Sequence, residues 1–169
     1  MKKAGFNGKE NMIIIQPFQK KYGRQVQALI STIQRKEFNL PITLEQQSDL
    51  LDISGYYQKD KGDFWIALDG DSVIGTIALL DIGHGNAAIR KLFVKKEYRR
   101  KSVATKLLDQ LLEWAEAYQL KQIYLETIAI FPSAHRFYEK NGFVKIDITE
   151  LPRSFPVMSA ESKFYCREI

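Results

Sequence analysis

The chain has 169 residues, a formal net charge of +5, and a composition that is 45% hydrophobic and 27% charged. This length suits one domain around one continuous core, and the composition excludes a disordered or collagen-like protein. The single cysteine, Cys166, excludes an internal disulfide and favours a cytoplasmic location. The longest apolar run near the N-terminus, residues 12–15, is too short for a membrane span or a signal-peptide core.

Residues 1–11 are polar, contain glycine and lack periodicity, which predicts a flexible leader before a single domain over residues 12–169. The positive charge is unevenly distributed. Five basic residues lie between Lys95 and Lys101 against Glu97 alone, a local net charge of +4 that leaves about +1 for the rest of the chain. Charge confined to one short segment suits a compact anion, so we expect no nucleic-acid partner.

In chain order, the sequence first predicts a strand over Met12 to Pro17. Apolar residues then recur at helical spacing after Phe18, which predicts a helix that ends before Pro41. Thr43 and Gln46 have the spacing of a capping box. They predict a second short helix that runs toward Ile53 and ends at Gly55.

Two short turns organise the middle of the chain. Asp69-Gly70-Asp71 predicts a hairpin between strands over residues 64–68 and 73–82. Residues 83–86 form the second turn and lead into a strand over 88–94. Strands joined by such short turns pair antiparallel, so we expect a three-stranded meander.

The last third alternates helices and strands. Apolar residues at three- and four-residue intervals from Val103 to Ala115 predict an amphipathic helix on the sheet. A strand over residues 122–127 follows, then a helix that begins at Pro132 and stops at Asn141-Gly142. Strands over 143–148 and 163–166 complete an α/β fold with helices on both faces of a mixed sheet.

The basic segment connects the strand that ends in Leu92-Phe93-Val94 to the helix that opens at Ser102. A helix N-terminus presents unpaired N–H groups and the positive end of a dipole, so such a turn predicts a phosphate site. Backbone amides and the Lys and Arg side chains of such a turn both suit the phosphate groups of a ligand.

The run Arg99-Arg100-Lys101-Ser102-Val103-Ala104 resembles the phosphate signature of the GNAT acetyltransferases, in which Arg or Gln is followed by two residues, Gly, one residue, and Gly or Ala. Ser102 replaces the central Gly. Leu125-Glu126-Thr127 and the run from Phe137 to Phe143 are similar to the second block of the family. The resemblance spans residues 64–148 and implies a GNAT-like fold with a mostly antiparallel sheet of about six or seven strands.

The resemblance also implies acetyl-CoA as co-substrate, no metal, and a monomer or homodimer that transfers acetyl to a primary amine by direct attack in a ternary complex. The pantetheine arm is expected between the strands at 92–94 and 122–127, where backbone N–H near Phe93 polarises the thioester. The implied cofactor-binding residues are Leu92, Phe93, Val94, Arg99, Arg100, Lys101, Ser102, Val103, Ala104, Thr105, Phe131 and Tyr138.

Two residues are candidates for catalytic roles, Tyr138 by the resemblance and Glu126 by its place near the end of its strand. Tyr138 is the expected general acid toward the CoA thiolate, with plain packing of its helix as the alternative. Glu126 is a candidate general base, with a structural carboxylate as the alternative. Phe131 stands where the family commonly has Asn, and Ala88 stands where it often has Glu. Both residues therefore depart from the family pattern.

Several alternatives stay open. The chain could be a non-catalytic acyl-CoA-binding or regulatory protein with a GNAT-like fold, and a nucleic-acid-binding module is a more distant second. His84 and His135 are expected to be solvated, and Cys166 to be a small buried hydrophobe. Residues 41–60 carry a local net charge of −3, which either attracts a cationic acceptor amine or is an exposed helix face.

Overall fold

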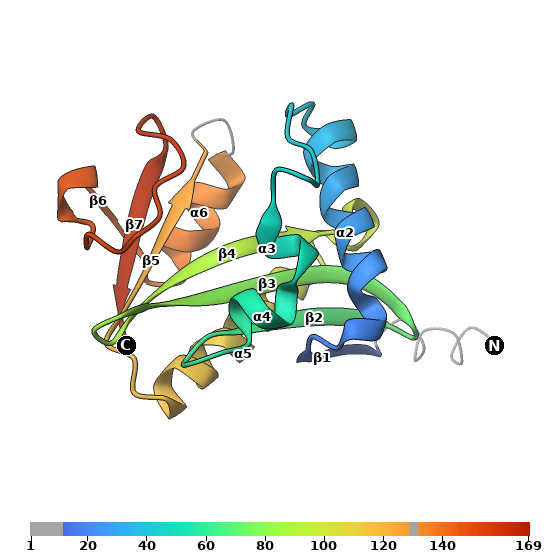
Figure 1. Ribbon diagram of the computed structural model, residues 1–169, viewed down its shortest axis with the longest axis horizontal. Helices are drawn as coiled ribbons and strands as arrows, with labels where there is room; N and C mark the ends of the chain where they lie inside the picture. Colours follow the sequence, from blue (N-terminus) through green and yellow to red (C-terminus); the bar gives the residue numbers. More distant parts are fainter. Residues whose placement is uncertain (1–11, 129–131) are drawn as a thin grey trace.

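The computed structural model describes residues 12–128 and 132–169. The expected flexible leader at 1–11 and the expected cofactor contact at Phe131 therefore lie outside the described residues. In the described part, seven strands form one sheet in the order β1-β2-β3-β4-β5-β7-β6 (Figure 1). The strands are Ile13–Pro17 (β1), Asp63–Asp69 (β2), Ser72–Gly83 (β3), Asn86–Val94 (β4), Gln122–Thr127 (β5), Val144–Ile146 (β6) and Lys163–Glu168 (β7).

Only the β4–β5 neighbours are parallel among these pairs of described strands, and the others are antiparallel. The predicted mixed, mostly antiparallel sheet is thereby confirmed. The helices are Lys20–Tyr22 (η1), Gly23–Ser31 (α2), Thr32–Glu37 (η2), Ser48–Leu51 (α3), Ile53–Tyr57 (α4), Lys96–Tyr98 (η3), Val103–Ala117 (α5), Pro132–Lys140 (α6) and Ile148–Glu150 (η4).

Helices lie on both faces of the sheet, as predicted. Figure 1 shows α2, α3 and α4 in front of the strands, with α5 behind them. The apolar stripe of α5 is buried on β3 and β4, where it forms one core cluster together with residues of α6. The second cluster lies under α2 and α4, around Val26, Ile30 and Phe64. The apolar periodicity read from the sequence thus buries each helix on its expected face.

The segment before β2 differs from its prediction. Thr43 and Gln46 do exchange both capping-box hydrogen bonds, at 3.0 and 3.3 Å, but they close a turn and α3 begins only at Ser48. Asp52 then interrupts the helix and caps α4 by accepting a hydrogen bond from Gly55 N at 3.1 Å. Gly55 therefore lies inside α4, and the prediction that a helix ends there is wrong. A Cβ at this position would collide with the Asp52 carboxylate, so the cap requires glycine.

The last strands also differ in length. The sequence predicted a strand over residues 143–148, whereas β6 covers only Val144–Ile146. Asp147 ends it, since its side chain accepts a hydrogen bond from Thr149 N and builds a capping box with Glu150 that opens η4. β7 extends two residues past its predicted end, to Glu168.

Candidate cofactor and acceptor site

Strands β4 and β5 diverge, and this divergence is the main feature of the site. Their parallel pairing runs only from Asn86 opposite Gln122 to Ile89 opposite Leu125. Beyond those residues β4 continues to Val94 and β5 continues to Thr127 beside β7, and Figure 1 shows the two strands running apart. The β5-facing peptide groups at the end of β4 are therefore left without a strand partner, which suits an extended ligand.

A β-bulge lies in β4 at the start of this gap. Thr76 is opposite Phe93 and Ala78 is opposite Arg90, so β4 has one residue more than β3 over this stretch. Lys91 lies in the bulge with a φ of 56°, and its carbonyl accepts a 2.7 Å hydrogen bond from the buried Thr76 hydroxyl. Bulges re-aim backbone and side-chain groups, and they are common beside active sites.

The direction of the peptide groups follows from strand alternation. Lys95 N donates to Ile74 O of β3 at 2.8 Å, so the adjacent Val94 faces away from β3. The Val94 carbonyl accepts from Arg99 Nε instead, at 3.0 Å. Alternation then places the Leu92 peptide group on the same open side and directs that of Phe93 toward β3. The polarising N–H expected near Phe93 is therefore better assigned to its neighbours.

The basic turn leads into an uncapped helix. Arg100 and Ser102 both have a φ of 64°, in the left-handed region that favours glycine. Ser102 is the N-cap of α5, but its side chain makes no capping hydrogen bond, and the first turn of α5 has no acidic residue. The N–H groups of Val103, Ala104 and Thr105 are thus open to an anion, beside the exposed Arg100 and Lys101.

Arg99 differs from Arg100 and Lys101 because its side chain is paired with a carboxylate. Its guanidinium forms a two-pronged ion pair with Glu37 at the end of η2, with Nη2 and Oε1 2.8 Å apart. It also lies over the Phe38 ring, 5.9 Å from the ring centre. This hydrogen bonding lowers the pKa of Glu37 below its ordinary value. Arg99 therefore connects the basic turn to η2, whereas Arg100 and Lys101 are exposed beside the start of α5.

Tyr138 lies on α6 and is 7% exposed. Its ring packs against Phe137, Phe143 and Tyr165. Burial raises the pKa of the phenol well above its ordinary value, so the hydroxyl stays protonated at neutral pH. Among the described residues the structure shows no hydrogen-bond partner for this hydroxyl. The phenol is therefore able to donate a proton, but its raised pKa also makes it a weaker acid than an ordinary tyrosine.

Glu126 lies at the end of β5 and holds the loop before β7. Its carboxylate accepts hydrogen bonds from Met158 N at 2.9 Å, from Ser159 N at 2.8 Å and from the Ser162 hydroxyl at 2.8 Å. Both oxygens are therefore engaged by the loop. This contact set supports the structural alternative for Glu126 more than the general-base hypothesis.

The histidines and Ala88 complete the sequence candidates. His84 is exposed in the turn before β4, as expected. The expectation for His135 is wrong, because this side chain is buried and its Nε2 lies 3.2 Å from Ile128 O. Ala88 is fully buried against Phe155 and Phe164, so a carboxylate in its place would need substantial repacking.

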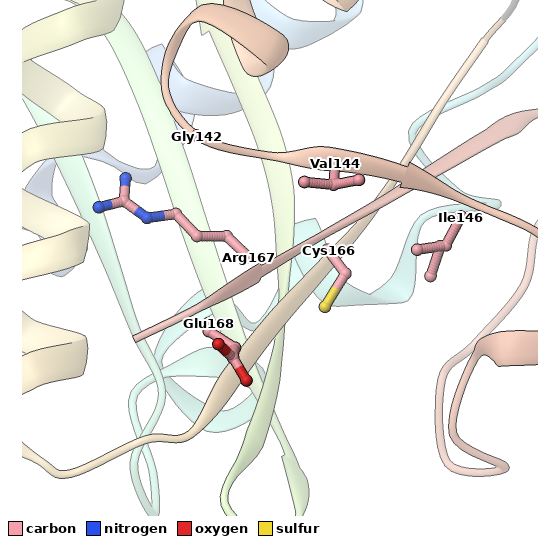
Figure 2. Close-up of a pocket in the computed structure, with 6 residues that line it drawn as sticks. All are labelled: Gly142, Val144, Ile146, Cys166, Arg167 and Glu168. Carbon is pink, nitrogen blue, oxygen red and sulfur yellow. The ribbon is translucent and has the colours of Figure 1, made fainter.

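Cys166 lines an open hollow on β6 and β7 that has a cavity volume of about 410 Å³ (Figure 2). Its Sγ lies 2.6 Å from Gln122 Oε1, and burial raises the pKa of the thiol. The other lining residues are Gly142, Val144, Ile146, Arg167 and Glu168. None of the sequence-predicted site residues lines this hollow, so we place the site at the β4–β5 gap instead.

Sequence reasoning missed a buried polar network beside the bulge, formed by Gln34, Gln47, Asp49, Tyr57 and Lys91. The acidic segment was noticed, but Asp49 is paired inside the protein and offers no free charge to a cationic amine, whereas Asp52 caps α4 and stays exposed. The described residues contain no group of three or more His, Cys, Asp or Glu side chains placed to hold a metal. Nor does any helix in the described part have the length and apolar character needed to cross a bilayer.

Diverging strands, a bulge in the first of them and an uncapped helix N-terminus together suit an extended, phosphate-bearing ligand. The family model for the acetyltransferase (GNAT) family matches residues 28–143, and the chain belongs to that family. Acetyl-CoA is the co-substrate of these enzymes. The chain is accordingly an acyltransferase of the GNAT type.

Three similar proteins illustrate the range of the family. Streptothricin acetyltransferase A of Bacillus subtilis is 31% identical over 149 residues, 85% of each chain. N-acetylaspartate synthetase of Xenopus tropicalis is 33% identical over 106 residues, which are 62% of this chain and only 39% of that protein. The crystal structure of a GNAT-family acetyltransferase from Staphylococcus aureus Mu50 has a TM-score of 0.87 and 35% identity, covering 92% of this chain and 98% of that one.

Proposed function

We propose that this protein transfers an acetyl group from acetyl-CoA to a primary amine by direct attack within a ternary complex. The observation that carries the proposal is the gap between β4 and β5, which opens beside the β4 bulge and the uncapped start of α5. The two named relatives act on different amines according to their names, so family membership alone does not fix the acceptor.

In this proposal, the N–H groups of Val103, Ala104 and Thr105 bind the pyrophosphate, with Ser102 at the point of closest approach. Arg100 and Lys101 meet the 3′-phosphate, and Arg99 positions the turn through Glu37. The pantetheine arm lies in the gap as an added strand, paired with the peptide groups of Leu92 and Val94. Phe93 supports β4 from the other side, where it packs under α2 and α4. We retain Phe131 as a proposed cofactor contact.

The transfer begins when the neutral amine nitrogen attacks the thioester carbonyl carbon. A C–N bond forms and the carbonyl oxygen becomes an oxyanion, which the Leu92 N–H stabilises. The tetrahedral intermediate then collapses with cleavage of the C–S bond, and the Tyr138 hydroxyl donates its proton to the departing thiolate. The proton released from the amine nitrogen passes to water or, under the general-base hypothesis, to Glu126, and the Tyr138 phenolate regains a proton from water.

The test is isothermal titration with acetyl-CoA. We expect one site per chain in the wild type, and about tenfold or more weaker binding when Arg100 and Lys101 are both changed to Ala, since each loses a charge-assisted contact. The control changes Lys59 and Lys61 to Ala, which removes the same charge from an exposed turn before β2. Absence of binding in the wild type would contradict the proposal.

Turnover is measured next, with acetyl-CoA and the amines L-aspartate, L-lysine, spermidine and streptothricin. CoA release that depends on one of these amines supports an N-acetyltransferase. Tight acetyl-CoA binding without release on any of them supports the alternative of a non-catalytic acyl-CoA-binding protein instead.

A further inference from the structure

A buried polar network joins the β4 bulge to the α3–α4 segment. The Lys91 ammonium donates to Gln47 Oε1 and lies 3.5 Å from Asp49 Oδ2. The Tyr57 hydroxyl donates to the same Asp49 oxygen at 2.6 Å. Gln47 in turn exchanges hydrogen bonds with Gln34 of η2, at 2.8 and 3.1 Å. Lys91 is thus connected, directly or through Gln47 and Asp49, to three helical segments on that face of the sheet. These segments are η2, α3 with the turn before it, and α4.

This network is costly to bury. The side chains of Lys91 and Asp49 are each 7% exposed, so both charges are largely removed from water. Burial lowers the pKa of Lys91, and the nearby Asp49 carboxylate opposes that effect. A buried ion pair seldom stabilises a fold more than apolar residues of similar size. Stability alone therefore gives little reason for a lysine here.

The position of Lys91 gives a better reason. Lys91 occupies a left-handed conformation that a non-glycine residue rarely adopts, and it directly precedes Leu92. Its backbone carbonyl is held by Thr76 and its side chain by Asp49 and Gln47. These two anchors fix the peptide unit that links Lys91 to Leu92, and the N–H of that unit faces the open side of β4.

We propose that Lys91 is a positioning residue for acetyl transfer: through Asp49 and Gln47 it holds the bulge so that the Leu92 N–H points at the thioester oxygen. The same contacts hold α3 and the preceding turn against the bulge, so that the thioester end and the adjacent helical layer form one rigid unit. This inference rests on the proposed function and adds the residue that orients its oxyanion donor.

The inference predicts a loss in turnover and not in cofactor affinity. The phosphate contacts at α5 lie outside the network, so acetyl-CoA binding is expected to change less than about twofold. An N–H that swings away from the oxyanion is expected to lower kcat by about 10- to 100-fold, somewhat less than deletion of an oxyanion donor. The KM for the amine is expected to rise less than kcat falls.

The decisive variant removes the network without leaving a buried charge behind. Lys91→Met, Asp49→Leu and Tyr57→Phe together replace the polar contacts by apolar side chains of similar volume, while Gln34 and Gln47 keep their mutual pair. Its Tm, its acetyl-CoA Kd by titration and its kcat are compared with those of the wild type. We expect a Tm and Kd close to the wild type and a kcat lowered by at least about tenfold.

A kcat within about twofold of the wild type in this folded triple variant overturns the inference, because the network would then only hold the fold. If the triple variant does not fold, Lys91→Arg and Lys91→Gln decide. Arg keeps the charge and the donors and is expected to recover kcat to within about fivefold, whereas Gln is not. Equal kcat for Lys91→Gln and the wild type also overturns it. A wild type that binds no acetyl-CoA, or that turns over none of the four amines, is instead a failure of the proposed function.

Discussion

The two faces of the sheet are built on different chemistry. Under α5 the buried cluster is made by apolar side chains, with Leu107, Leu108 and Leu111 fully buried against β3 and β4. Under α2–α4 an apolar cluster also exists, but Lys91, Asp49 and Gln47 are buried beside it. The difference teaches that one face supports the strands while the other also connects distant segments to the bulge of β4.

The largest expected effect is on the free energy of unfolding, and it tests whether the apolar cluster under α5 stabilises the fold. Leu107→Ala removes a fully buried side chain, and we expect a loss of about 2–5 kcal/mol in the free energy of unfolding. Urea unfolding monitored by circular dichroism measures it. Leu51→Ala is the control, because Leu51 is 55% exposed and its loss is expected to stay within about 0.5 kcal/mol. If Leu107→Ala lowers the free energy of unfolding by less than about 1 kcal/mol, the proposed difference between the two faces of the sheet is contradicted.

Tyr138 is part of the apolar cluster under α5. A catalytic role for Tyr138 would therefore show that this face of the sheet does more than support the strands. Tyr138→Phe is expected to lower kcat by about 10- to 100-fold, a modest general-acid effect because a thiolate leaves easily. Acetyl-CoA affinity and Tm should stay near the wild type, since the hydroxyl has no partner among the described residues. Tyr165→Phe is the control, because it removes a 2.8 Å hydrogen bond to Glu139 and is expected to change Tm more than kcat.

The same tyrosine makes a prediction about pH. Burial raises the pKa of Tyr138, so its phenol keeps its proton through the range in which an ordinary tyrosine, with a pKa of about 10, begins to lose it. We therefore expect no fall in kcat from this group up to about pH 10. A fall in kcat with a midpoint near pH 9 that disappears in Tyr138→Phe would contradict the raised pKa.

Ser102 tests whether the start of α5 is built for stability or for a ligand. Ser102 has a left-handed backbone, so Ser102→Gly is expected to raise the free energy of unfolding by about 0.5–1 kcal/mol. Removal of the side chain should also tighten acetyl-CoA binding. Ser133→Gly, at an exposed position in the first turn of α6, is the control and is expected to lower the free energy of unfolding by up to about 0.5 kcal/mol. A lower free energy of unfolding in both variants would show that the backbone at Ser102 is not strained.

The smallest expected effect concerns the Arg99–Glu37 contact between the basic turn and η2. Arg99 lowers the pKa of Glu37, so the ion pair stabilises the fold above the ordinary pKa of glutamate and stops doing so as the pH falls through the lowered value. Glu37→Gln should therefore cost at most about 1 kcal/mol at pH 7, because the pair is partly exposed. Tm differences from the wild type at pH 7 and at about pH 4 measure it, and a larger difference at the lower pH would contradict the sign.

The sequence predicted the parts of this molecule that depend on local patterns. The limits of α5 followed from the spacing of its apolar residues, and the hairpin at Gly70 followed from its turn residues. The family resemblance, carried by the run from Arg99 to Ala104 and by the block around Tyr138, is confirmed. The roles of the individual site residues stay predictions.

The parts that escaped prediction depend on residues far apart in the chain. Lys91 and Gln47 are 44 positions apart, and Arg99 and Glu37 are 62 apart. Nothing in the spacing of apolar or charged residues indicates such pairs. The bulge escaped as well, because one extra residue in a strand shows only when the partner strand is known. The burial of His135 likewise involves a residue distant in the chain, Tyr165 of β7, whose ring lies beside the imidazole.

The short β4–β5 pairing has a consequence for how this sheet assembles. Strands β1 to β4 are joined in a run of antiparallel neighbours, and β5, β7 and β6 form a second antiparallel group. Between the two groups only four residue pairs, from Asn86–Gln122 to Ile89–Leu125, make the strand contact, and α5 crosses over between them. Contacts across a crossover close a longer loop than contacts within a hairpin, so the junction forms later. The seam proposed for pantetheine is thus also the line along which the two antiparallel groups part, and we expect its amide protons to exchange when they do.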